Sequence, residues 1–170
     1  MIFVTVGTHE QPFNRLVEYM DRLKENKIIE EDVIIQIGYS TYEPQYCTWS
    51  KLFPYPKMVK YVEEARIVIT HGGPSSFIMP LQIGKIPIVV PRQKQFDEHV
   101  NDHQVEFAKA VAERQKNIIT VEDITCLQDV ILNYNDRVSG MTAGQNSNNA
   151  EFNAKLKSVV DELMRERKKR

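Results

Sequence analysis

A histidine, two glycines, a proline and two serines make up the stretch 71–76, "HGGPSS", directly after an apolar run at 67–70. Glycines let the backbone approach a ligand closely, and Pro74 suits the first turn of a helix. Ser75 and Ser76 would add hydroxyl donors beside the free N–H groups of a helix N-terminus, which attract phosphate. The residues alone leave two interpretations open, a phosphate site or a tight strand-to-helix turn with serine capping. The stretch matches neither common nucleotide-binding fingerprint, G-x-x-x-x-G-K-[ST] or G-x-G-x-x-G.

Histidines give the second chemical signal. His71 begins the stretch above, and His9 lies in the polar segment 7–11, "GTHEQ". A histidine at either place could hold an anion or move a proton near neutral pH. Each also has a structural interpretation. His71 could be a strand-end side chain bonded to backbone, and His9 a helix-capping or surface side chain.

The segment 92–104, "RQKQFDEHVNDHQ", carries the other two histidines. His99 and His103 are four residues apart, the spacing of one helix face, and could pair on a metal ion. Because no third ligand is evident, we expect no metal, and donors and acceptors that face sugar hydroxyls suit this segment better. Glu98 could equally be a first-turn acid that the helix dipole favours.

The elements that must position these loops alternate between strand and helix. Short apolar runs predict strands at 2–6, 33–37, 52–53, 67–70, 87–91 and 118–121. Apolar residues at helical spacing predict helices that open at Pro12 and at Pro56, then at 74–84, 98–114, 124–132 and 152–163. This order predicts an α/β fold, a Rossmann-like open parallel sheet with helices on both faces. Ligands of such sheets bind at the carboxyl ends of the strands, where the polar segments lie.

Four aromatic residues gather in the segment 39–50, which shows no clear period and is predicted to be a loop. They are Tyr39, Tyr42, Tyr46 and Trp49. Such side chains recur where sugars and bases stack or where partners dock. They could equally fold over a hydrophobic cluster of their own.

The composition bounds the class of protein. The chain has 170 residues, 42% of them hydrophobic, which suits one globular domain with a sizeable core. A net charge of −1 gives no basic field to draw nucleic acid. Cys47 and Cys126 lack metal-type spacing, and no apolar run approaches the roughly 20 residues of a membrane span. We therefore expect a cytoplasmic protein that reaches a membrane only through a partner or a surface contact.

The chain divides into one domain and a tail. Residues 1–139 form the predicted Rossmann-like domain, and 140–149, "GMTAGQNSNN", form a polar linker. A last helix is predicted within 150–170, ending in the basic run Arg165–Arg170. That basic end is either a solvated helix terminus or a weak contact for anionic lipid.

Three segments resemble one protein family in their order and spacing. They are "VTVGTHEQPFNRL" at 4–16, "LFPYPKMVKYVEEARIVITHGGPSSF" at 52–77 and "GKIPIVVPRQKQFDEHVNDHQ" at 84–104. The family is the glycosyltransferase family 28 C-terminal domain in its stand-alone form. The sequence resembles the catalytic subunits of two-subunit bacterial capsular or exopolysaccharide galactosyltransferases. It is also similar to the cytosolic subunit of the eukaryotic dolichol-linked N-acetylglucosaminyltransferase and to the C-terminal half of the lipid II-forming enzyme.

The resemblance implies the UDP-sugar-binding half of a GT-B enzyme. It places the first loop, Gly7, Thr8 and His9, near the diphosphate and the interdomain cleft. The uracil would lie near Tyr55 and Met58. The diphosphate would lie on His71, Gly72, Gly73, Ser75 and Ser76, and the donor sugar on Glu98, His99, His103 and Gln104. The sequence departs from the family at Met79, where many members carry a ribose-binding glutamate, so that contact would be weaker or come from elsewhere, for example from Gln82.

The resemblance also implies a reaction. The family transfers a sugar with inversion from a UDP-α-sugar, without a metal or other cofactor. Amides, hydroxyls and the helix dipole at 72–76 would stabilise the leaving UDP. His9 is the candidate general base within this chain, although the base could lie in the partner.

Partners and specificity follow from the resemblance as well. A GT-B enzyme has two domains, so we expect a membrane-associated subunit that brings the acceptor domain and a lipid-linked saccharide acceptor to the inner face of the membrane. The favoured reaction is β-galactosyl transfer from UDP-galactose in capsule or exopolysaccharide synthesis, with N-acetylglucosamine or glucuronic acid as rival sugars. The alternatives from other classes are a non-catalytic stabilising subunit and a nucleotide-binding regulator. A UDP-sugar 2-epimerase needs two fused domains, which this length does not provide.

Overall fold

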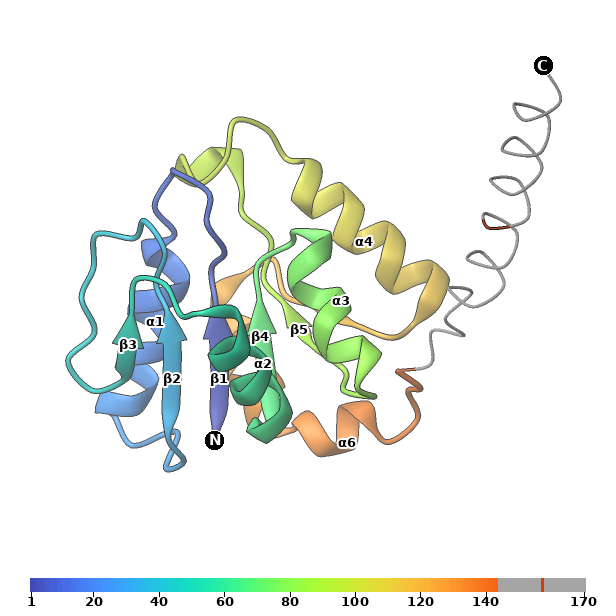
Figure 1. The fold of residues 1–170 in the computed structure, drawn as a ribbon, viewed down its shortest axis with the longest axis horizontal. Helices are drawn as coiled ribbons and strands as arrows, with labels where there is room; N and C mark the ends of the chain where they lie inside the picture. The colour runs from blue at the N-terminus through green and yellow to red at the C-terminus, as the bar shows by residue number, and fades with distance from the viewer. Residues whose placement is uncertain (144–156, 158–170) are drawn as a thin grey trace, which may run out of the picture.

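Six parallel strands form one open sheet in the computed structural model, which describes residues 1–143 and Lys157 (Figure 1). Their order is β3-β2-β1-β4-β5-β6, so β1 pairs with both β2 and β4. The strands are β1 Ile2–Thr5, β2 Val33–Gln36, β3 Thr48–Ser50, β4 Ile67–Thr70, β5 Ile88–Val89 and β6 Ile119–Thr120. This order is that of a doubly wound nucleotide-binding sheet, and it confirms the predicted Rossmann-like fold.

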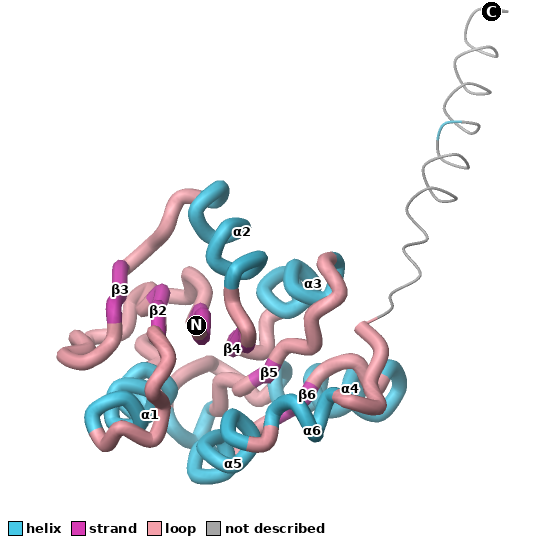
Figure 2. Tube along the Cα trace, turned by 90° about the horizontal axis from the view of Figure 1, so that it is seen from below, coloured by secondary structure: helices cyan, strands magenta, loops and turns pink. Residues whose placement is uncertain are grey.

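Helices cover both faces of the sheet, with α2 and α3 on one face and α1 and α5 on the other (Figure 2). Most of the predicted helices are present, although their ends differ by a few residues. The helices are α1 Asn14–Glu25, α2 Tyr55–Glu64, α3 Pro74–Gln82, α4 His103–Gln115, α5 Leu127–Leu132 and α6 Tyr134–Val138, with 3₁₀ turns η1 Lys94–Phe96 and η2 Ile124–Cys126.

The alternation of side chains along each strand divides the core between the two faces. Ile2 and Val4 of β1 join the cluster that contains Leu16 of α1 and residues of α5 and α6. Phe3 points to the opposite face and packs with Val62 of α2. On that same face, α3 and α4 form a further cluster with β5. Because both faces are covered, the polar loops at the strand ends are left to form a site.

The strand order reverses between β1 and β4. The chain places β2 and β3 on one side of β1 and then returns to place β4, β5 and β6 on the other. At such a reversal the loops that follow the two strands diverge and leave a crevice at their carboxyl ends. The polar segments 7–11 and 71–76 follow β1 and β4, so both border this crevice.

The edge strand β3 differs from the sequence prediction. It lies within the predicted loop 39–50 and pairs with β2 from Ile34↔Thr48 to Gln36↔Ser50. The predicted strand at 52–53 is wrong, because Leu52 is exposed and Phe53 donates its N–H to the Gln36 side chain instead of to a strand. A strand of three residues is too short to show an alternating pattern in the sequence.

Helix α4 begins at His103 and not at the predicted Glu98. The 3₁₀ turn η1 occupies Lys94–Phe96, and Asp97 follows it in the left-handed conformation with φ of 55°. That conformation interrupts any helix, and Asp102 is the N-cap residue of α4. Glu98 and His99 therefore lie in a loop, and His99 does not share a helix face with His103.

The tail is largely outside the described residues. The predicted helix within 150–170 lies there, and only 140–143 of the predicted linker are described. These boundaries stay predictions. None of the helices that the structure describes has both the length and the apolar character of a membrane span.

Candidate functional site

The loops after β1 and β4 meet beside His71. The two strands pair in register from Ile2↔Ile67 to Thr5↔Thr70, and His71 extends the ladder by donating its N–H to the Thr5 carbonyl at 3.2 Å. This register brings Gly7 against the His71 ring. The two polar segments therefore belong to one site.

Two glycines make room for the His71 imidazole. A Cβ built on Gly7 would lie 2.4 Å from His71 Nε2, and a Cβ on Gly73 would lie 2.3 Å from His71 Cε1. Gly7 also has a φ of 76°, which disfavours any other residue. The sequence predicts these glycines as places where backbone approaches a ligand, and the structure adds that they accommodate this ring.

The His71 ring is partly buried and bonded on both nitrogens. Nδ1 accepts a hydrogen bond from the Gly73 N–H at 3.0 Å, and Nε2 lies 2.7 Å from Ser76 Oγ. Burial, followed by the positive charge of Arg92, lowers the pKa of His71 to about 4. The ring is therefore neutral at physiological pH. The backbone bond of the structural interpretation is present, together with a link to a serine of the predicted site.

Helix α3 begins as the motif predicts, with Gly73 as N-cap residue and Pro74 in its first position. Within the described part of the chain, no side chain caps this helix start, so the serine capping of the structural interpretation is absent. Ser75 and Ser76 instead line a cavity. The positive end of the helix dipole and two hydroxyl groups thus face open space.

A cavity of about 530 Å³ opens between α2 and α3 and is here called the α2–α3 cavity. Its apolar wall consists of Met58, Val62 and Met79. The buried side chains of Gln36 and Thr5 also line it, and Gln36 Nε2 donates to Thr5 Oγ1 at 3.2 Å. The predicted site residues that line it are Gly7, Thr8, His9, Met58, His71, Ser75, Ser76, His99 and Gln104.

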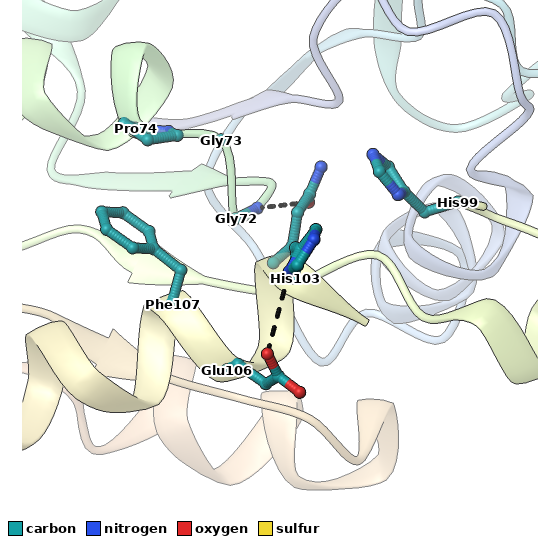
Figure 3. Close-up of a pocket in the computed structure, with 8 residues that line it drawn as sticks. Gly72, Gly73, Pro74, His99, His103, Glu106 and Phe107 are labelled. Carbon is teal, nitrogen blue, oxygen red and sulfur yellow. Dashed lines mark hydrogen bonds and ion pairs between the residues drawn. The ribbon is translucent and has the colours of Figure 1, made fainter. Parts of the chain in front are cut away.

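A second cavity of about 630 Å³, the α3–α4 cavity, lies between the start of α3 and the first turns of α4 (Figure 3). Phe107 and Pro74 form part of its apolar lining, and His103 lies 3.8 Å from the carboxylate of Glu106. The predicted site residues that line it are Gly72, Gly73, His99, His103 and Gln104. His99 and Gln104 line both cavities, which are therefore neighbours.

Gln104 joins the segments around the two cavities. Its Oε1 accepts the Gly72 N–H at 3.0 Å and the Arg92 N–H at 3.2 Å. A Cβ on Gly72 would lie 2.8 Å from Gln104 Cβ, so this close contact requires a glycine. Because the oxygen accepts both bonds, the amide N–H₂ group is the part of Gln104 left to donate to a ligand.

His9 and His99 stack on one another beside the α2–α3 cavity. Their ring centroids are 4.6 Å apart, and the ring planes differ by 24°. His9 Nε2 lies 3.0 Å from Gln11 Oε1, and Gln11 Nε2 donates to the Asp97 carbonyl at 3.1 Å. Because Gln11 Oε1 can only accept, His9 Nε2 is the donor and His9 Nδ1 keeps its lone pair. A neutral imidazole with a free Nδ1 can take up a proton.

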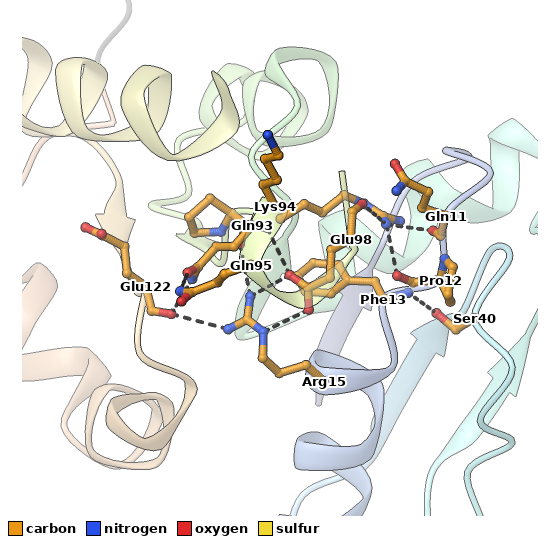
Figure 4. Close-up of polar contacts among 12 residues, drawn as sticks. Gln11, Pro12, Phe13, Arg15, Ser40, Gln93, Lys94, Gln95, Glu98 and Glu122 are labelled. Carbon is orange, nitrogen blue, oxygen red and sulfur yellow. Dashed lines mark hydrogen bonds and ion pairs between the residues drawn. The ribbon is translucent and has the colours of Figure 1, made fainter. Parts of the chain in front are cut away.

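Glu98 lines neither cavity and is buried in a loop. Its carboxylate accepts two hydrogen bonds from Arg15, at 2.8 Å and 2.9 Å, and one from the Gln93 N–H at 3.0 Å (Figure 4). Both carboxylate oxygens are thus engaged within the chain. This geometry favours a structural ion pair over the predicted contact with the donor sugar.

Arg92 is fully buried, and the sequence analysis does not single it out. Its guanidinium donates to the carbonyls of Gln11 at 2.7 Å, Val6 at 2.9 Å and Glu98 at 3.1 Å. Burial lowers the pKa of Arg92 to about 10, and the charge of Glu98 opposes that effect. Arg92 therefore ties the loop after β1 to the segment after β5, the two loops that carry His9 and His99. An arginine directly after the apolar run "PIVVP" is the signal that could have revealed it.

Thr5 and Gln36 are two further residues of the site that the sequence analysis misses. Thr5 Oγ1 accepts the Gly7 N–H at 3.3 Å, and Gln36 Oε1 accepts the Phe53 N–H at 2.9 Å. They thereby fix the first loop and the segment before α2. The available signal is a polar residue at the carboxyl end of an otherwise apolar strand.

Tyr55 and the aromatic segment lie apart from the cavities. Tyr55 is 69% exposed and lines neither of them. Tyr42 donates its hydroxyl to Asp21 at 2.8 Å, and Trp49 donates Nε1–H to the Pro44 carbonyl at 3.0 Å. Both rings also pack against the core. Tyr39 and Tyr46 are exposed, so the four aromatic residues do not form a cluster of their own.

Carboxylates are scarce around the α2–α3 cavity. Met79 lines it at the position where the resemblance leads us to expect an acid, and neither Asp nor Glu is among its lining residues in the described chain. Gln82, the suggested substitute, lines neither cavity. Across residues 1–143, no three His, Cys, Asp or Glu side chains are grouped so that they could hold a metal ion.

Comparison with known proteins assigns the family. The chain matches the model of the glycosyltransferase family 28 C-terminal domain over residues 1–163, and it therefore belongs to that family. No curated protein sequence matches the chain. Among solved structures, it is similar to the crystal structure of the glycosyltransferase SnogD from Streptomyces nogalater, with 17% sequence identity and a TM-score of 0.49. The match covers 93% of this chain and 43% of that one, so the chain spans less than half of that protein's length.

Proposed function

We propose that the chain is the donor-binding, catalytic half of an inverting glycosyltransferase that uses a UDP-sugar. The observation that carries this proposal is the uncapped start of α3, which presents Ser75 and Ser76 to the α2–α3 cavity at the reversal of strand order. A helix N-terminus with hydroxyl donors suits a diphosphate. Membership of a glycosyltransferase family over residues 1–163 supports the same class of reaction.

The two cavities suggest how a UDP-sugar lies. A flat, largely apolar base suits the wall formed by Met58, Val62 and Met79, with the ribose toward the mouth of the α2–α3 cavity. The diphosphate then rests on the segment 72–76. The sugar extends toward Gln104, whose amide can donate to a hydroxyl group, and toward the α3–α4 cavity.

The reaction we propose is one displacement. An acceptor hydroxyl oxygen forms a bond to the anomeric carbon while the bond from that carbon to the diphosphate oxygen breaks, which inverts the configuration. The charge that develops on the departing UDP is stabilised by the α3 dipole and its hydroxyl groups, without a metal. His9 Nδ1 is the base in this chain that takes the proton of the acceptor hydroxyl.

The proposal extends to the sugar that is transferred and to the partner subunit. We infer β-galactosyl transfer from UDP-galactose to a lipid-linked saccharide, in capsule or exopolysaccharide synthesis at the inner face of the membrane. The rest of the GT-B enzyme, including the acceptor domain, comes from a membrane-associated subunit. UDP-N-acetylglucosamine and UDP-glucuronic acid are the competing donors that a donor screen with this subunit must include.

Calorimetric titration of the full chain with UDP, GDP, CDP and TDP tests the core of the proposal. We expect UDP to bind most tightly and Gly73→Val to abolish binding, because the new side chain would collide with His71 and with the diphosphate. Gly140→Val is the matched control, since a Cβ there meets no atom within 4 Å. Equal binding of all four nucleotides, or none, would overturn the donor assignment. UDP binding without sugar transfer in the presence of the partner would instead favour a stabilising subunit.

A further inference from the structure

The hydrogen bonds of His71 define where its proton resides. Nδ1 accepts the Gly73 N–H at 3.0 Å, and an atom that accepts a hydrogen bond carries no proton of its own. A neutral imidazole has one N–H, which must then be on Nε2. Ser76 Oγ is 2.7 Å from Nε2, so Nε2–H donates and the serine oxygen accepts.

The consequence concerns the hydroxyl proton of Ser76. A serine hydroxyl has one proton to donate, and it cannot donate to a ring nitrogen that already bears a proton. That proton must point elsewhere, and Ser76 lines the α2–α3 cavity. We propose that His71 is a positioning residue, which turns the hydroxyl proton of Ser76 into the cavity so that it donates to an oxygen of the bound diphosphate. The diphosphate in this inference rests on the proposed function, whereas the orientation of the hydroxyl rests on the ring geometry alone.

The packing around the ring keeps this arrangement fixed. Gly7 and Gly73 both lie against the imidazole, since a Cβ on either residue would come within 2.4 Å of a ring atom, and the bond from the Gly73 N–H to Nδ1 holds the ring in this orientation. The buried guanidinium of Arg92 disfavours a second proton on the ring, as does burial itself. His71 therefore acts through Ser76 as a neutral donor, and no proton passes from the ring to the ligand.

The tautomer of His71 can be observed directly in the full chain without any ligand. A two-bond ¹H–¹⁵N correlation spectrum near neutral pH separates the two neutral tautomers and the charged ring, and loss of one signal set in His71→Gln gives the assignment. We expect Nε2 to be protonated and Nδ1 to be bare. A proton on Nδ1, or on both nitrogens, would overturn the inference, because the serine would then donate to the ring or the ring would be a cation.

A double-mutant cycle on UDP affinity tests whether His71 acts through Ser76. We expect Ser76→Ala to weaken UDP binding about tenfold, as for a hydrogen bond to a charged group. His71→Gln should weaken binding by several-fold in the wild-type background and by less than about twofold in the Ser76→Ala background. Equal effects in both backgrounds would show that His71 contacts the ligand by itself and would overturn its role as a positioning residue.

Controls separate this inference from the function on which it rests. Ser139→Ala removes an exposed hydroxyl that donates to the Asp136 carbonyl, and it should leave UDP affinity unchanged. Circular dichroism shows whether His71→Gln folds, and the tautomer measurement needs no variant apart from the assignment. If UDP fails to bind the wild-type chain, the proposed donor is wrong. In that case the spectrum of the ligand-free chain still decides the orientation of Ser76.

Discussion

Three polar side chains of the site each have one atom whose hydrogen bond within the chain fixes the role of their other polar atom. His9 donates through Nε2 to Gln11, His71 accepts through Nδ1 from Gly73, and Gln104 accepts through Oε1 from Gly72. In each side chain, the hydrogen bond that one polar atom makes determines whether the other polar atom donates or accepts. Groups oriented before a ligand arrives lose less freedom on binding and bind more tightly for it.

The pH dependence of stability should reveal the partly buried His71 ring. The pKa of the ring is 6.5 when it is unfolded and about 4 in the native state, so between these values the unfolded chain holds more protons. We expect the free energy of unfolding to have its full value above pH 6.5. It should fall as the pH drops toward 4, by up to about 3 kcal/mol. Urea denaturation across this range measures it. In His71→Gln the free energy of unfolding should depend less on pH between 6.5 and 4. An equal pH dependence in the variant and the wild type would contradict the prediction.

The bond between His9 and Gln11 should matter for turnover. We expect His9→Ala to lower kcat about 100-fold or more, as loss of a general base does, and Gln11→Leu to lower kcat about tenfold with little change in KM. The leucine leaves His9 in place but removes the acceptor that keeps Nδ1 unprotonated. Gln45→Leu, in the exposed loop after β2, is the matched control. A change in KM alone for Gln11→Leu would argue against this role, as would an unchanged kcat for His9→Ala.

At the residue scale, the sequence reveals the chemistry of the loops but not their contacts. His9, His71 and Gln104 stand out because polar residues that follow apolar strands must lie at one edge of the sheet. The roles of Glu98 and Arg92 could not be foreseen, because each depends on a residue more than 80 positions away, Arg15 and Val6 respectively. A carboxylate in a polar segment looks the same in the sequence whether it faces solvent or a buried guanidinium.

At the scale of elements, a single buried acid holds the connection between β2 and β3. Asp21 on α1 accepts the N–H groups of Gln45, Tyr46 and Cys47 at 2.8–3.0 Å, and it also accepts the hydroxyl of Tyr42. Burial acts to raise its pKa, but these hydrogen bonds outweigh burial and lower the pKa below its ordinary value. The hydrogen bond from the Tyr42 hydroxyl to Asp21 raises the pKa of Tyr42 to about 12.

Asp21→Asn should therefore destabilise the fold by about 1–3 kcal/mol, because an amide presents only one acceptor oxygen to these donors. We expect urea denaturation to show the loss and hydrogen exchange to quicken at the amides of 45–47. Asp136→Asn, at an exposed position on α6, should change neither. Unchanged exchange at 45–47 in Asp21→Asn would mean that another contact holds the segment.

The limits of prediction at this scale follow from element length. The strands at 2–6, 33–37 and 67–70 and the amphipathic α1 show their period clearly in the sequence. By contrast, β3 has three residues, and the start of α4 depends on a left-handed Asp97 that no local pattern indicates. Asp97 lies two residues before His99, which lines the α3–α4 cavity. That is why the sequence finds its lining residues but misplaces His99 on a helix.

At the scale of the whole molecule, Arg92 connects parts of the chain that the sheet alone would leave independent. Its guanidinium donates to the carbonyls of Val6, Gln11, Pro12 and Glu98 and thereby joins the segments after β1 and β5. The stacked His9 and His99 lie on these same two segments. The separation of the two rings therefore depends on a residue that touches neither cavity.

Arg92→Met should lower the thermal midpoint by several degrees, since it leaves four carbonyls, two of them in buried hydrogen bonds, without their donor. Arg92→Lys should recover only part of this loss, because one ammonium group cannot span all four acceptors. We also expect hydrogen exchange to rise in 7–12 and 93–98 together. Arg22→Met, on an exposed face of α1, serves as the matched control. Exchange that rises in only one of the two segments would refute the coupling.

The strand order has a consequence for the nascent chain. β1 is synthesised before both of its neighbours, and its second neighbour, β4, ends at residue 70. At about 5–20 residues per second, one edge of β1 stays unpaired on the ribosome for on the order of several seconds. No other strand of the sheet is separated so far along the chain from a strand with which it pairs. An apolar edge left open for that time is a place where chains mispair, so slow codons between residues 6 and 66 should lower the yield of folded protein.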